Sequence, residues 1–445
     1  MKLSTSLSLL TVLPLALAAP MCSLKKTATA AVSAPTGAST PTGTAPPPTS
    51  TGNSTSGGAG GGNSTRISMG WFADWHDNFT VSNINWGGYN AMAFFTAQPD
   101  NNLNVLLQGT NVESMLEQFV SAAHTNNVKA LLTLGGWSGS VYWSSSVATA
   151  QNRSTFANNV AQFASAHNLD GIDFDWEYPG KQGAGCNIVN SNDTANFLEF
   201  ITELRQLAPN LTLSAAVSVL PFVDSTGNPM TDVSGFAKQL DWIEIMNYDV
   251  FGSFSTVTGP NAPLNDSCSS HPSGSAVSAV AAWTKAGFSA NQIVLGVPSY
   301  GHSFSVPSST AAPSGNQLEI YTSFSSSNTP QGDAWDYIPP GTIDACTGQP
   351  EGPNGVFNFW AMVGYGYLNS DGSVASGMLS TFDQCSQTPF VYNPNSQILI
   401  SYDDPQSFTA KGQYIAQAGL RGFAMYEVGG DYNGMLLNAI NKAMS

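Results

Sequence analysis

Eight short apolar runs alternate with longer helical patterns from residue 66 onward, and this alternation limits the fold more than any other feature of the chain. Between most of the runs, apolar residues recur at the i, i+3, i+4 spacing of amphipathic helices. Strands that alternate with helices favour a parallel sheet, and eight such units suit the length of a closed barrel. We therefore expect an α/β fold, a (β/α)8 TIM barrel. The expected strands are 66–72, 90–95, 129–135, 171–177, 211–217, 242–248, 292–298 and 421–427, and the helical patterns include 112–125, 153–167, 193–207 and 275–286.

An open doubly wound sheet is the alternative arrangement of such units. It is disfavoured because the glycine fingerprint that usually follows its first strand is absent. The segment between the last two expected strands is about one hundred residues long, and a connection of that length without structure is implausible in a compact domain. We expect one barrel domain over 66–445, with a small α+β subdomain inserted within 301–396.

The first 65 residues differ from the rest of the chain. Residues 1–18 resemble a secretory signal peptide, with Lys2 before an apolar run and a small-x-small cleavage site at 16–18. Residues 19–65 form a linker, nearly all Ala, Ser, Thr, Pro and Gly from residue 27, which is typical of an O-glycosylated stalk or a disordered tail. We expect a secreted, extracellular glycoprotein. N-x-Ser/Thr sequons support this at Asn53, Asn63, Asn78, Asn152, Asn192, Asn210 and Asn265.

The chain has five cysteines, and none of them lie at the C-x-x-C spacing of a metal site. Cys22 precedes the linker, and the other four can form two disulfides in an oxidising compartment, with three possible pairings. Their places in the expected fold favour Cys186 with Cys268, on loops at the barrel mouth, and Cys346 with Cys385, inside the insertion.

Composition narrows the class of partner. Lys plus Arg is 13 and Asp plus Glu is 29, which gives a formal charge of −16. Such a chain lacks the basic patches that nucleic acid binding needs. After the leader no apolar run is long enough to cross a bilayer. We expect a monomer that binds a neutral ligand, with no nucleic acid, membrane, metal or cofactor.

The stretch GIDFDWE places three carboxylates at every second position of an apolar strand. Side chains alternate between the two faces of a strand, so Asp173, Asp175 and Glu177 share one face. The apolar face suits the helix layer, and the carboxylates then point into the barrel. Buried carboxylates repel one another, and some must stay protonated, which is typical of functional sites. Glu177 is nearest the carboxyl end of the strand, where barrel enzymes keep their chemistry, so it is a candidate general acid.

These residues resemble a known signature. DGIDFDWE is similar to the D-G-x-D-x-D-x-E motif of glycoside hydrolase family 18, the chitinases. TLGGW at 133–137 resembles the family's S-x-G-G, and MNYD at 246–249 resembles its M-x-Y-D. GVPSYGHSF and SYDDPQS follow in the expected order, so the resemblance spans about 66–435, and it is strongest to secreted fungal-type chitinases.

The resemblance implies a role for each motif residue. Glu177 is similar to the acid/base, Asp175 to the residue that turns toward it, and Asp173 to a deeper proton-sharing partner. Tyr248 is similar to the donor to the substrate's acetamido carbonyl, with Asp249 beside it. In this family the N-acetyl oxygen of the substrate is the nucleophile, so the reaction retains anomeric configuration.

The resemblance also implies substrate-binding residues. Tyr426 stands where the family usually has Trp, and Trp71 stands where many relatives have Tyr. Trp71 is equally compatible with packing inside the barrel, and we expect His302, Glu244 and Tyr178 to be packing or supporting groups. The implied binding residues are Asp249, Met246, Trp137, Trp71, Trp75, Gly135, Gly136 and Tyr426.

The sequence therefore predicts a secreted, endo-acting chitinase that hydrolyses β-1,4-linked N-acetylglucosamine polymers. One alternative is an endo-β-N-acetylglucosaminidase acting on N-glycans. Another is a chitin-binding lectin without catalysis, although such proteins usually lack the last Glu of the motif, and Glu177 is present. An esterase is disfavoured because no G-x-S-x-G elbow occurs.

Overall fold

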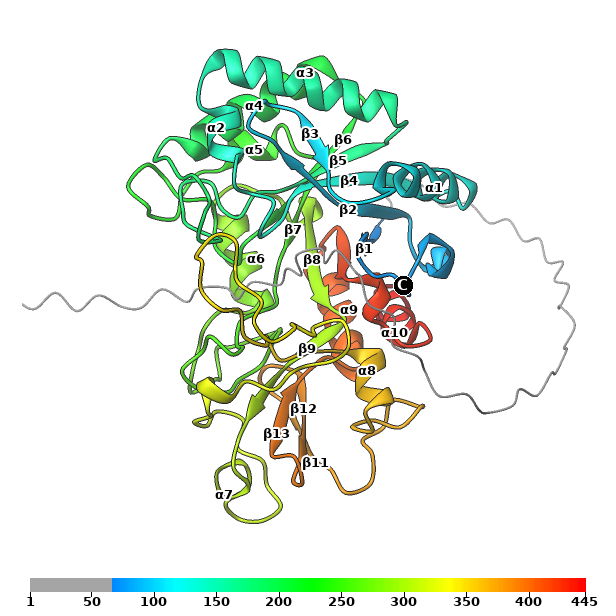
Figure 1. Cartoon of the computed structure of the whole chain (residues 1–445), viewed down its shortest axis with the longest axis vertical. Coiled ribbons are helices and arrows are strands. Elements are labelled where there is room, and N and C mark those ends of the chain that lie inside the picture. Colours follow the sequence, from blue (N-terminus) through cyan, green and yellow to red (C-terminus); the bar gives the residue numbers. More distant parts are fainter. Residues whose placement is uncertain (1–65) are drawn as a thin grey trace, which may run out of the picture.

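The computed structural model describes residues 66–445, so the expected leader and linker lie outside the described residues. Eight parallel strands form a closed barrel in the order β1-β14-β8-β7-β6-β5-β4-β2, with β2 pairing back to β1 (Figure 1). The expected barrel is confirmed, and the strands differ from expectation only at their ends. They are β1 (Ile67–Ala73), β2 (Ala91–Pro99), β4 (Lys129–Gly135), β5 (Gly171–Asp175), β6 (Thr212–Val217), β7 (Trp242–Ile245), β8 (Ile293–Pro298) and β14 (Gly422–Tyr426), while β3 (Val105–Leu107) pairs antiparallel with β2.

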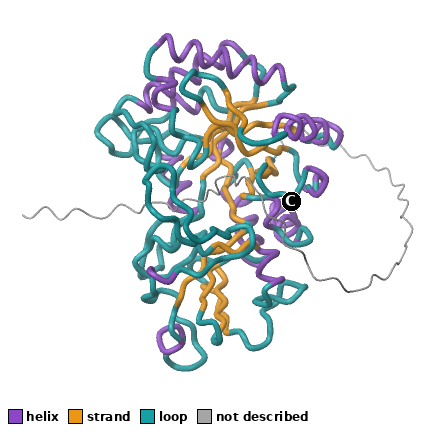
Figure 2. The backbone as a smooth tube through the Cα atoms, in the orientation of Figure 1, coloured by secondary structure: helices purple, strands orange, loops and turns teal. Residues whose placement is uncertain are grey.

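Helices surround the strands (Figure 2), and their ends carry recognisable signals. Helix α9 begins after Asp404, whose side chain accepts from the Ser407 amide, and it ends at Gly419 in the left-handed conformation. Within residues 66–445 no helix has the length and apolar character of a membrane span. The barrel helices are α1 (Val112–Thr125), α2 (Trp143–Val147), α3 (Ala150–Ala166), α4 (Asp193–Leu207), α5 (Ser234–Ala237), α6 (Ala276–Lys285), α9 (Pro405–Ala418) and α10 (Met435–Met444), and short 3-10 turns lie at Val81–Asn83, Trp86–Gly88, Ala290–Gln292, Ser326–Asn328 and Val428–Gly430.

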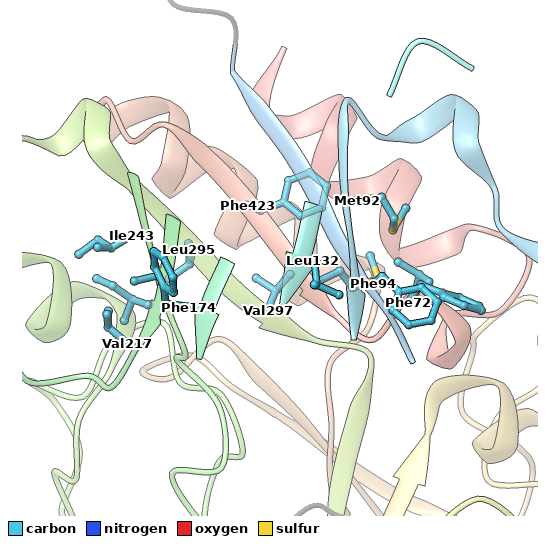
Figure 3. Packing of buried hydrophobic residues seen from close by; sticks show 14 of the residues in the cluster. Phe72, Met92, Phe94, Leu132, Phe174, Val217, Ile243, Leu295, Val297 and Phe423 are labelled. Atoms are coloured by element: carbon cyan, nitrogen blue, oxygen red, sulfur yellow. The ribbon is translucent and has the colours of Figure 1, made fainter. Parts of the chain in front are cut away.

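The barrel strands bury both faces, as a parallel sheet requires. Outward residues such as Phe94, Phe174 and Ile243 pack against the helices in one large apolar cluster (Figure 3). Inward residues form a second, smaller cluster that includes Met69, Trp71, Ala93, Leu131, Trp242, Val294 and Ala424. The polar groups of the candidate site therefore lie among apolar walls, and contact with bulk water is small.

The segment between β8 and β14 contains a second sheet, drawn below the barrel in Figure 1. It is antiparallel, in the order β10-β9-β13-β12-β11, and it has its own apolar cluster. The sheet begins and ends slightly outside the expected 301–396. Its elements are β9 (Tyr300–Ser305), α7 (Ser308–Ala311), β10 (Val356–Asn358), α8 (Phe359–Gly364), β11 (Leu379–Asp383), β12 (Thr388–Asn393) and β13 (Ile398–Ser401).

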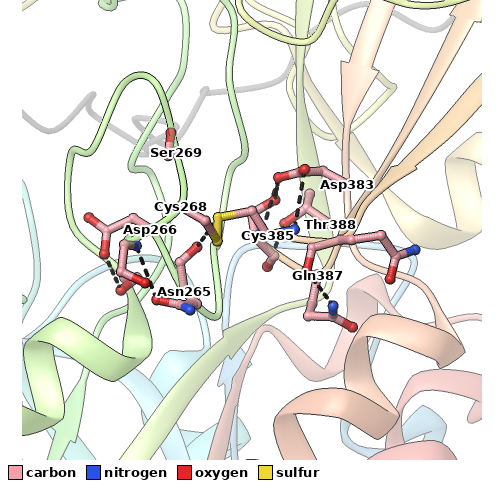
Figure 4. The surroundings of a disulfide bond; sticks show 12 residues. Asn265, Asp266, Cys268, Ser269, Asp383, Cys385, Gln387 and Thr388 are labelled. Carbon is pink, nitrogen blue, oxygen red and sulfur yellow. Dashed lines mark hydrogen bonds between the residues drawn. A yellow bond between two sulfur atoms is a disulfide. The ribbon is translucent and has the colours of Figure 1, made fainter.

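The disulfide pairing differs from the expected one. Cys186 is bonded to Cys346, and Cys268 to Cys385 (Figure 4). The expected pairs joined barrel to barrel and insertion to insertion, and that prediction is wrong. Each bond instead ties a loop of the barrel to the inserted segment. The physical reason is that these loops and the insertion lie against each other, which spacing along the chain does not reveal.

Candidate active site

The three carboxylates lie together inside the mouth of the barrel. Asp173 and Asp175 point inward from β5, and Glu177 follows two residues after that strand ends. Their relative exposures are 0%, 4% and 9%, so all three are removed from bulk solvent. Period-two alternation therefore predicted their shared face correctly, although the strand is two residues shorter than expected.

Asp173 is the deepest of the row and is held by donors from three strands. The Trp71 indole N–H and the Thr133 hydroxyl both donate to Oδ2 at 2.8 Å, and the Ser214 hydroxyl donates to Oδ1 at 2.9 Å. Burial raises the pKa of the Asp173 carboxyl, while these hydrogen bonds oppose the rise. Trp71 is only 1% exposed, so it lies beneath the carboxylates as a donor.

Asp175 occupies the middle of the row, below a pair of glycines. Gly135 and Gly136 have φ values of 123° and 87°, and a Cβ on Gly135 would lie 2.1 Å from the Asp175 carbonyl oxygen. Only glycine permits this approach. Burial, and then the negative charges of Glu177 and Asp173, raise the pKa of Asp175 well above its usual range. Its Oδ1 is buried without a hydrogen-bond partner among the described residues.

Glu177 is fixed through its backbone. Its N–H donates to the Ser140 hydroxyl at 3.0 Å, and its carbonyl oxygen accepts from Asn187 Nδ2 at 2.9 Å. Burial raises the pKa of the Glu177 carboxyl to about 7, with a hydrogen bond from Tyr178 lowering it and the charge of Asp249 raising it. Sequence analysis missed Ser140 and Asn187, because no local pattern indicates that they reach this peptide.

Tyr248 and Asp249 follow the end of β7. Asp249 has a left-handed φ of 55°, and its Oδ1 accepts from the Tyr300 hydroxyl at 2.8 Å and contacts His302 Nε2 at 2.7 Å. His302, expected to be structural, thus contacts a residue of the site from the first strand of the insertion. Burial, followed by the nearby carboxylates, raises the pKa of the Tyr248 phenol well above its usual range, so this hydroxyl stays a donor.

An aromatic group lies beside the carboxylates. The Tyr426 ring centre, at the end of β14, is 5.5 Å from that of Phe95, 6.0 Å from that of Trp71 and 6.1 Å from that of Tyr248. Trp75 packs edge-on against Phe95, with ring centres 5.6 Å apart. The structure therefore brings most of the expected binding residues to one place, with Met246 against the inward apolar cluster and Trp137 partly exposed directly after Gly136.

This arrangement has a definite chemical capability. It offers the Glu177 carboxyl group with a pKa of about 7, the Asp175 carboxyl group with a raised pKa, and the phenolic donor of Tyr248, all in a buried setting. Within residues 66–445, no cluster of three or more His, Cys, Asp or Glu side chains is suited to a metal ion. The two buried carboxyl groups and the buried phenol suit the site to proton transfer.

Sequence and structural similarity to known proteins identifies the family of this chain. The chain is 45% identical to a chitinase-like effector of Moniliophthora roreri, over 84% of this chain and 92% of that protein. A chitinase-like effector of Moniliophthora perniciosa is 43% identical, over 88% and 90%. The solved structure of a chitinase from Rhizomucor miehei superposes with a TM-score of 0.77 at 29% identity, over 86% of this chain and 100% of the other. The sequence model for glycosyl hydrolases family 18 matches residues 65–431, and this chain therefore belongs to that family.

Proposed function

We propose that this protein is a secreted chitinase that cleaves β-1,4-linked N-acetylglucosamine chains with retention of configuration. The observation that carries the proposal is Glu177, a buried acid with a pKa near 7 at the barrel mouth. A proton donor must hold its proton at working pH and release it to the leaving oxygen, and this environment allows both.

Each neighbour has a role in the proposed reaction. Glu177 gives its proton to the glycosidic oxygen as that bond breaks, while the substrate's N-acetyl oxygen attacks the anomeric carbon and forms an oxazolinium ion. Asp175 turns its unpaired oxygen toward the substrate and stabilises the positive charge, and the Tyr248 hydroxyl donates to the acetamido group. Water then attacks the anomeric carbon, the bond from that carbon to the N-acetyl oxygen breaks, and Glu177 takes the proton that the water releases.

Similar proteins support chitin as the substrate. Rhizomucor miehei has a chitinase of this fold, and two relatives are named chitinase-like. The name chitinase-like favours one competing function, which is chitin binding without hydrolysis. The presence of Glu177 and of its supporting hydrogen bonds favours hydrolysis.

The test is turnover of soluble chitin oligosaccharides by wild type and by Glu177→Gln. Gln keeps the size of the side chain and cannot give up the proton, so turnover should fall by on the order of 10² to 10⁴-fold while binding persists. Glu117→Gln, the same change on the exposed side of α1, is the matched control and should retain activity. Wild type that binds chitin and never cleaves it would identify a lectin, and near-normal turnover by Glu177→Gln would exclude Glu177 as the acid.

A second experiment tests the nucleophile and the substrate class. Fully deacetylated chitosan lacks the N-acetyl oxygen, so it should resist cleavage under conditions in which chitin oligosaccharides are cleaved. Efficient hydrolysis of chitosan would exclude the substrate-assisted route. Cleavage of N-glycan cores in preference to chitin would replace the proposed substrate with that of an endo-β-N-acetylglucosaminidase.

A further inference from the structure

Glu177 lies beyond the last paired residues of its strand. The register of β5 against β4 ends with Asp175 opposite Gly135. Its register against β6 ends one residue earlier, with Phe174 opposite Ala215. In the described part of the chain, the peptide groups that follow have no neighbouring strand to pair with. Both carboxyl groups must meet the same sugar in the proposed reaction, so other contacts have to fix the spacing between Asp175 and Glu177.

The hydroxyl group of Ser140 lies where the pairing stops. It accepts a hydrogen bond from the Glu177 N–H at 3.0 Å and donates one to the Gly136 carbonyl oxygen at 2.8 Å. The Asp175 carbonyl oxygen is also within its reach, at 3.3 Å. A serine hydroxyl has one proton to donate and two lone pairs to accept with. One side chain therefore serves three backbone groups, with its proton shared between the two carbonyl oxygens.

The loop after β4 carries Ser140 to this place. Just past the paired residues, the Gly136 N–H donates to the Asp175 carbonyl oxygen at 2.6 Å. The chain then turns so tightly that a Cβ on Gly139 would lie 2.0 Å from a backbone oxygen of β4, which only glycine permits. Ser140 is 0% exposed, so it contacts the Glu177 N–H away from bulk water. Its side chain thus extends the ladder between β4 and β5 by one further hydrogen bond.

The residue between the two carboxyl groups is held from the same segment of the chain. The Trp176 ring stacks on that of Trp143 in α2, with ring centres 5.3 Å apart and ring planes 9° apart. Both rings are buried in the outer apolar cluster. The segment from Asp175 to Glu177 is therefore fixed by one apolar contact on its outer face and one polar contact along its backbone. Of these two, the hydroxyl of Ser140 is the one that touches Glu177 itself.

We propose that Ser140 is a positioning residue, whose hydroxyl group fixes the Glu177 peptide relative to Asp175 and so sets where the acid stands against the substrate. The proposal deepens the proposed function and rests on it for its kinetic consequence. Asn187 holds the Glu177 carbonyl oxygen from the same loop as Glu177, whereas Ser140 holds the N–H from the loop of the neighbouring strand. Ser140 thereby ties the acid to β4, which is part of the rigid barrel.

The kinetic test is Ser140→Ala, assayed on a soluble chitin oligosaccharide. Alanine removes the acceptor of the Glu177 N–H and leaves every side chain implied in sugar binding unchanged. We expect kcat to fall by about 10- to 100-fold, because a displacement of about 1 Å at a reacting group costs rate on this order. KM should stay within about threefold of wild type, since the lost contact acts on the transition state more than on substrate binding.

The matched control is Ser144→Ala, in α2 of the same segment. Ser144 is 2% exposed, and its hydroxyl donates to Asp193 Oδ1 at 2.7 Å. Each variant loses one buried hydrogen bond, so the melting temperature, Tm, should fall by a similar amount in both. Ser144→Ala should keep the kcat of wild type. A normal kcat in Ser140→Ala, or equal losses of kcat in the two variants, would overturn the proposal.

A second measurement does not require turnover, so failure of the proposed function and failure of this proposal can be told apart. Hydrogen exchange of the Glu177 amide reports on its hydrogen bond directly. This amide should exchange as slowly as those of β5 in wild type and in Ser144→Ala, and about tenfold faster in Ser140→Ala, the value of one hydrogen bond.

Two exchange results would overturn the proposal. One is a Glu177 amide that is unprotected in wild type, and the other is equal protection in wild type and Ser140→Ala. The expected exchange pattern in a protein that never cleaves chitin oligosaccharides would reject the proposed function and still support the contact between Ser140 and Glu177.

Discussion

Glu177 shows how strongly the pKa of a single side chain depends on its surroundings. Its carboxyl group has the chemistry of any Glu, yet burial moves its pKa from 4.5 to about 7. Tyr178 opposes this by donating a hydrogen bond, and Asp249 reinforces it with negative charge. Burial is the largest of these effects, so the residue is an acid at neutral pH because the barrel mouth excludes water from it.

The pH dependence of hydrolysis follows from this value. The folded pKa is raised, so Glu177 holds its proton below about pH 7 and loses it above. We expect kcat/KM on a chitin oligosaccharide to fall as pH rises through this range, since the ionised group cannot act as an acid. Activity that keeps rising through pH 8 would contradict this assignment.

Tyr426 is a second residue whose surroundings change the expectation. From sequence alone, Tyr426→Trp should lower KM, because indole offers a sugar more apolar surface than phenol does. In the structure Trp71, Phe95 and Tyr248 already surround this ring at 5.5–6.1 Å. We now expect overpacking that costs about 1–3 kcal/mol, seen as a lower Tm with a raised KM. A lower KM at unchanged Tm would restore the expectation from sequence.

At the scale of elements, the loop after β5 controls where Glu177 sits. In this loop the Asn187 Nδ2 group donates a hydrogen bond to the Glu177 carbonyl oxygen at 2.9 Å. The adjacent Cys186 forms a disulfide with Cys346 of the insertion. The orientation of the acid therefore depends on a covalent link to a segment far along the chain.

The two disulfides provide a matched comparison. Cys186→Ala/Cys346→Ala and Cys268→Ala/Cys385→Ala should each lower stability by about 2–5 kcal/mol, since each removes one cross-link. Only the first pair frees the loop that holds Glu177, so it alone should also lower kcat, measured well below both melting temperatures. Equal losses of kcat in the two variants would show that the Cys186 link has no special effect on the acid.

On the scale of the whole molecule, the insertion and the barrel are joined at several points. Besides the disulfides, Tyr300 and His302 of β9 reach Asp249 at the barrel mouth. In addition, Asp403, just after β13, pairs with Lys411 of α9 at 2.5 Å, and Lys411 is 0% exposed. The insertion is thus fixed to the barrel by covalent, polar and ionic contacts together.

The buried ion pair gives a stability prediction. Lys411→Met leaves the Asp403 carboxylate unpaired and should cost about 3–5 kcal/mol of unfolding free energy. Replacing both members, Asp403→Leu/Lys411→Met, should recover most of that loss, because no isolated charge remains. Denaturant unfolding of the three proteins checks this, and a double variant no more stable than the single one would contradict it.

The sequence by itself determined what depends on neighbouring residues. The eight strands, the helix from 112 to 125 and the shared face of Asp173, Asp175 and Glu177 follow from periods of 2.0 and 3.6, which are local properties of the backbone. Tertiary structure alone decided the disulfide pairing and the contacts of Glu177 with Ser140 and Asn187. Such contacts join residues that are far apart in the sequence, so they depend on how the barrel closes and how its loops pack. Periodicity along the chain carries no information about this packing.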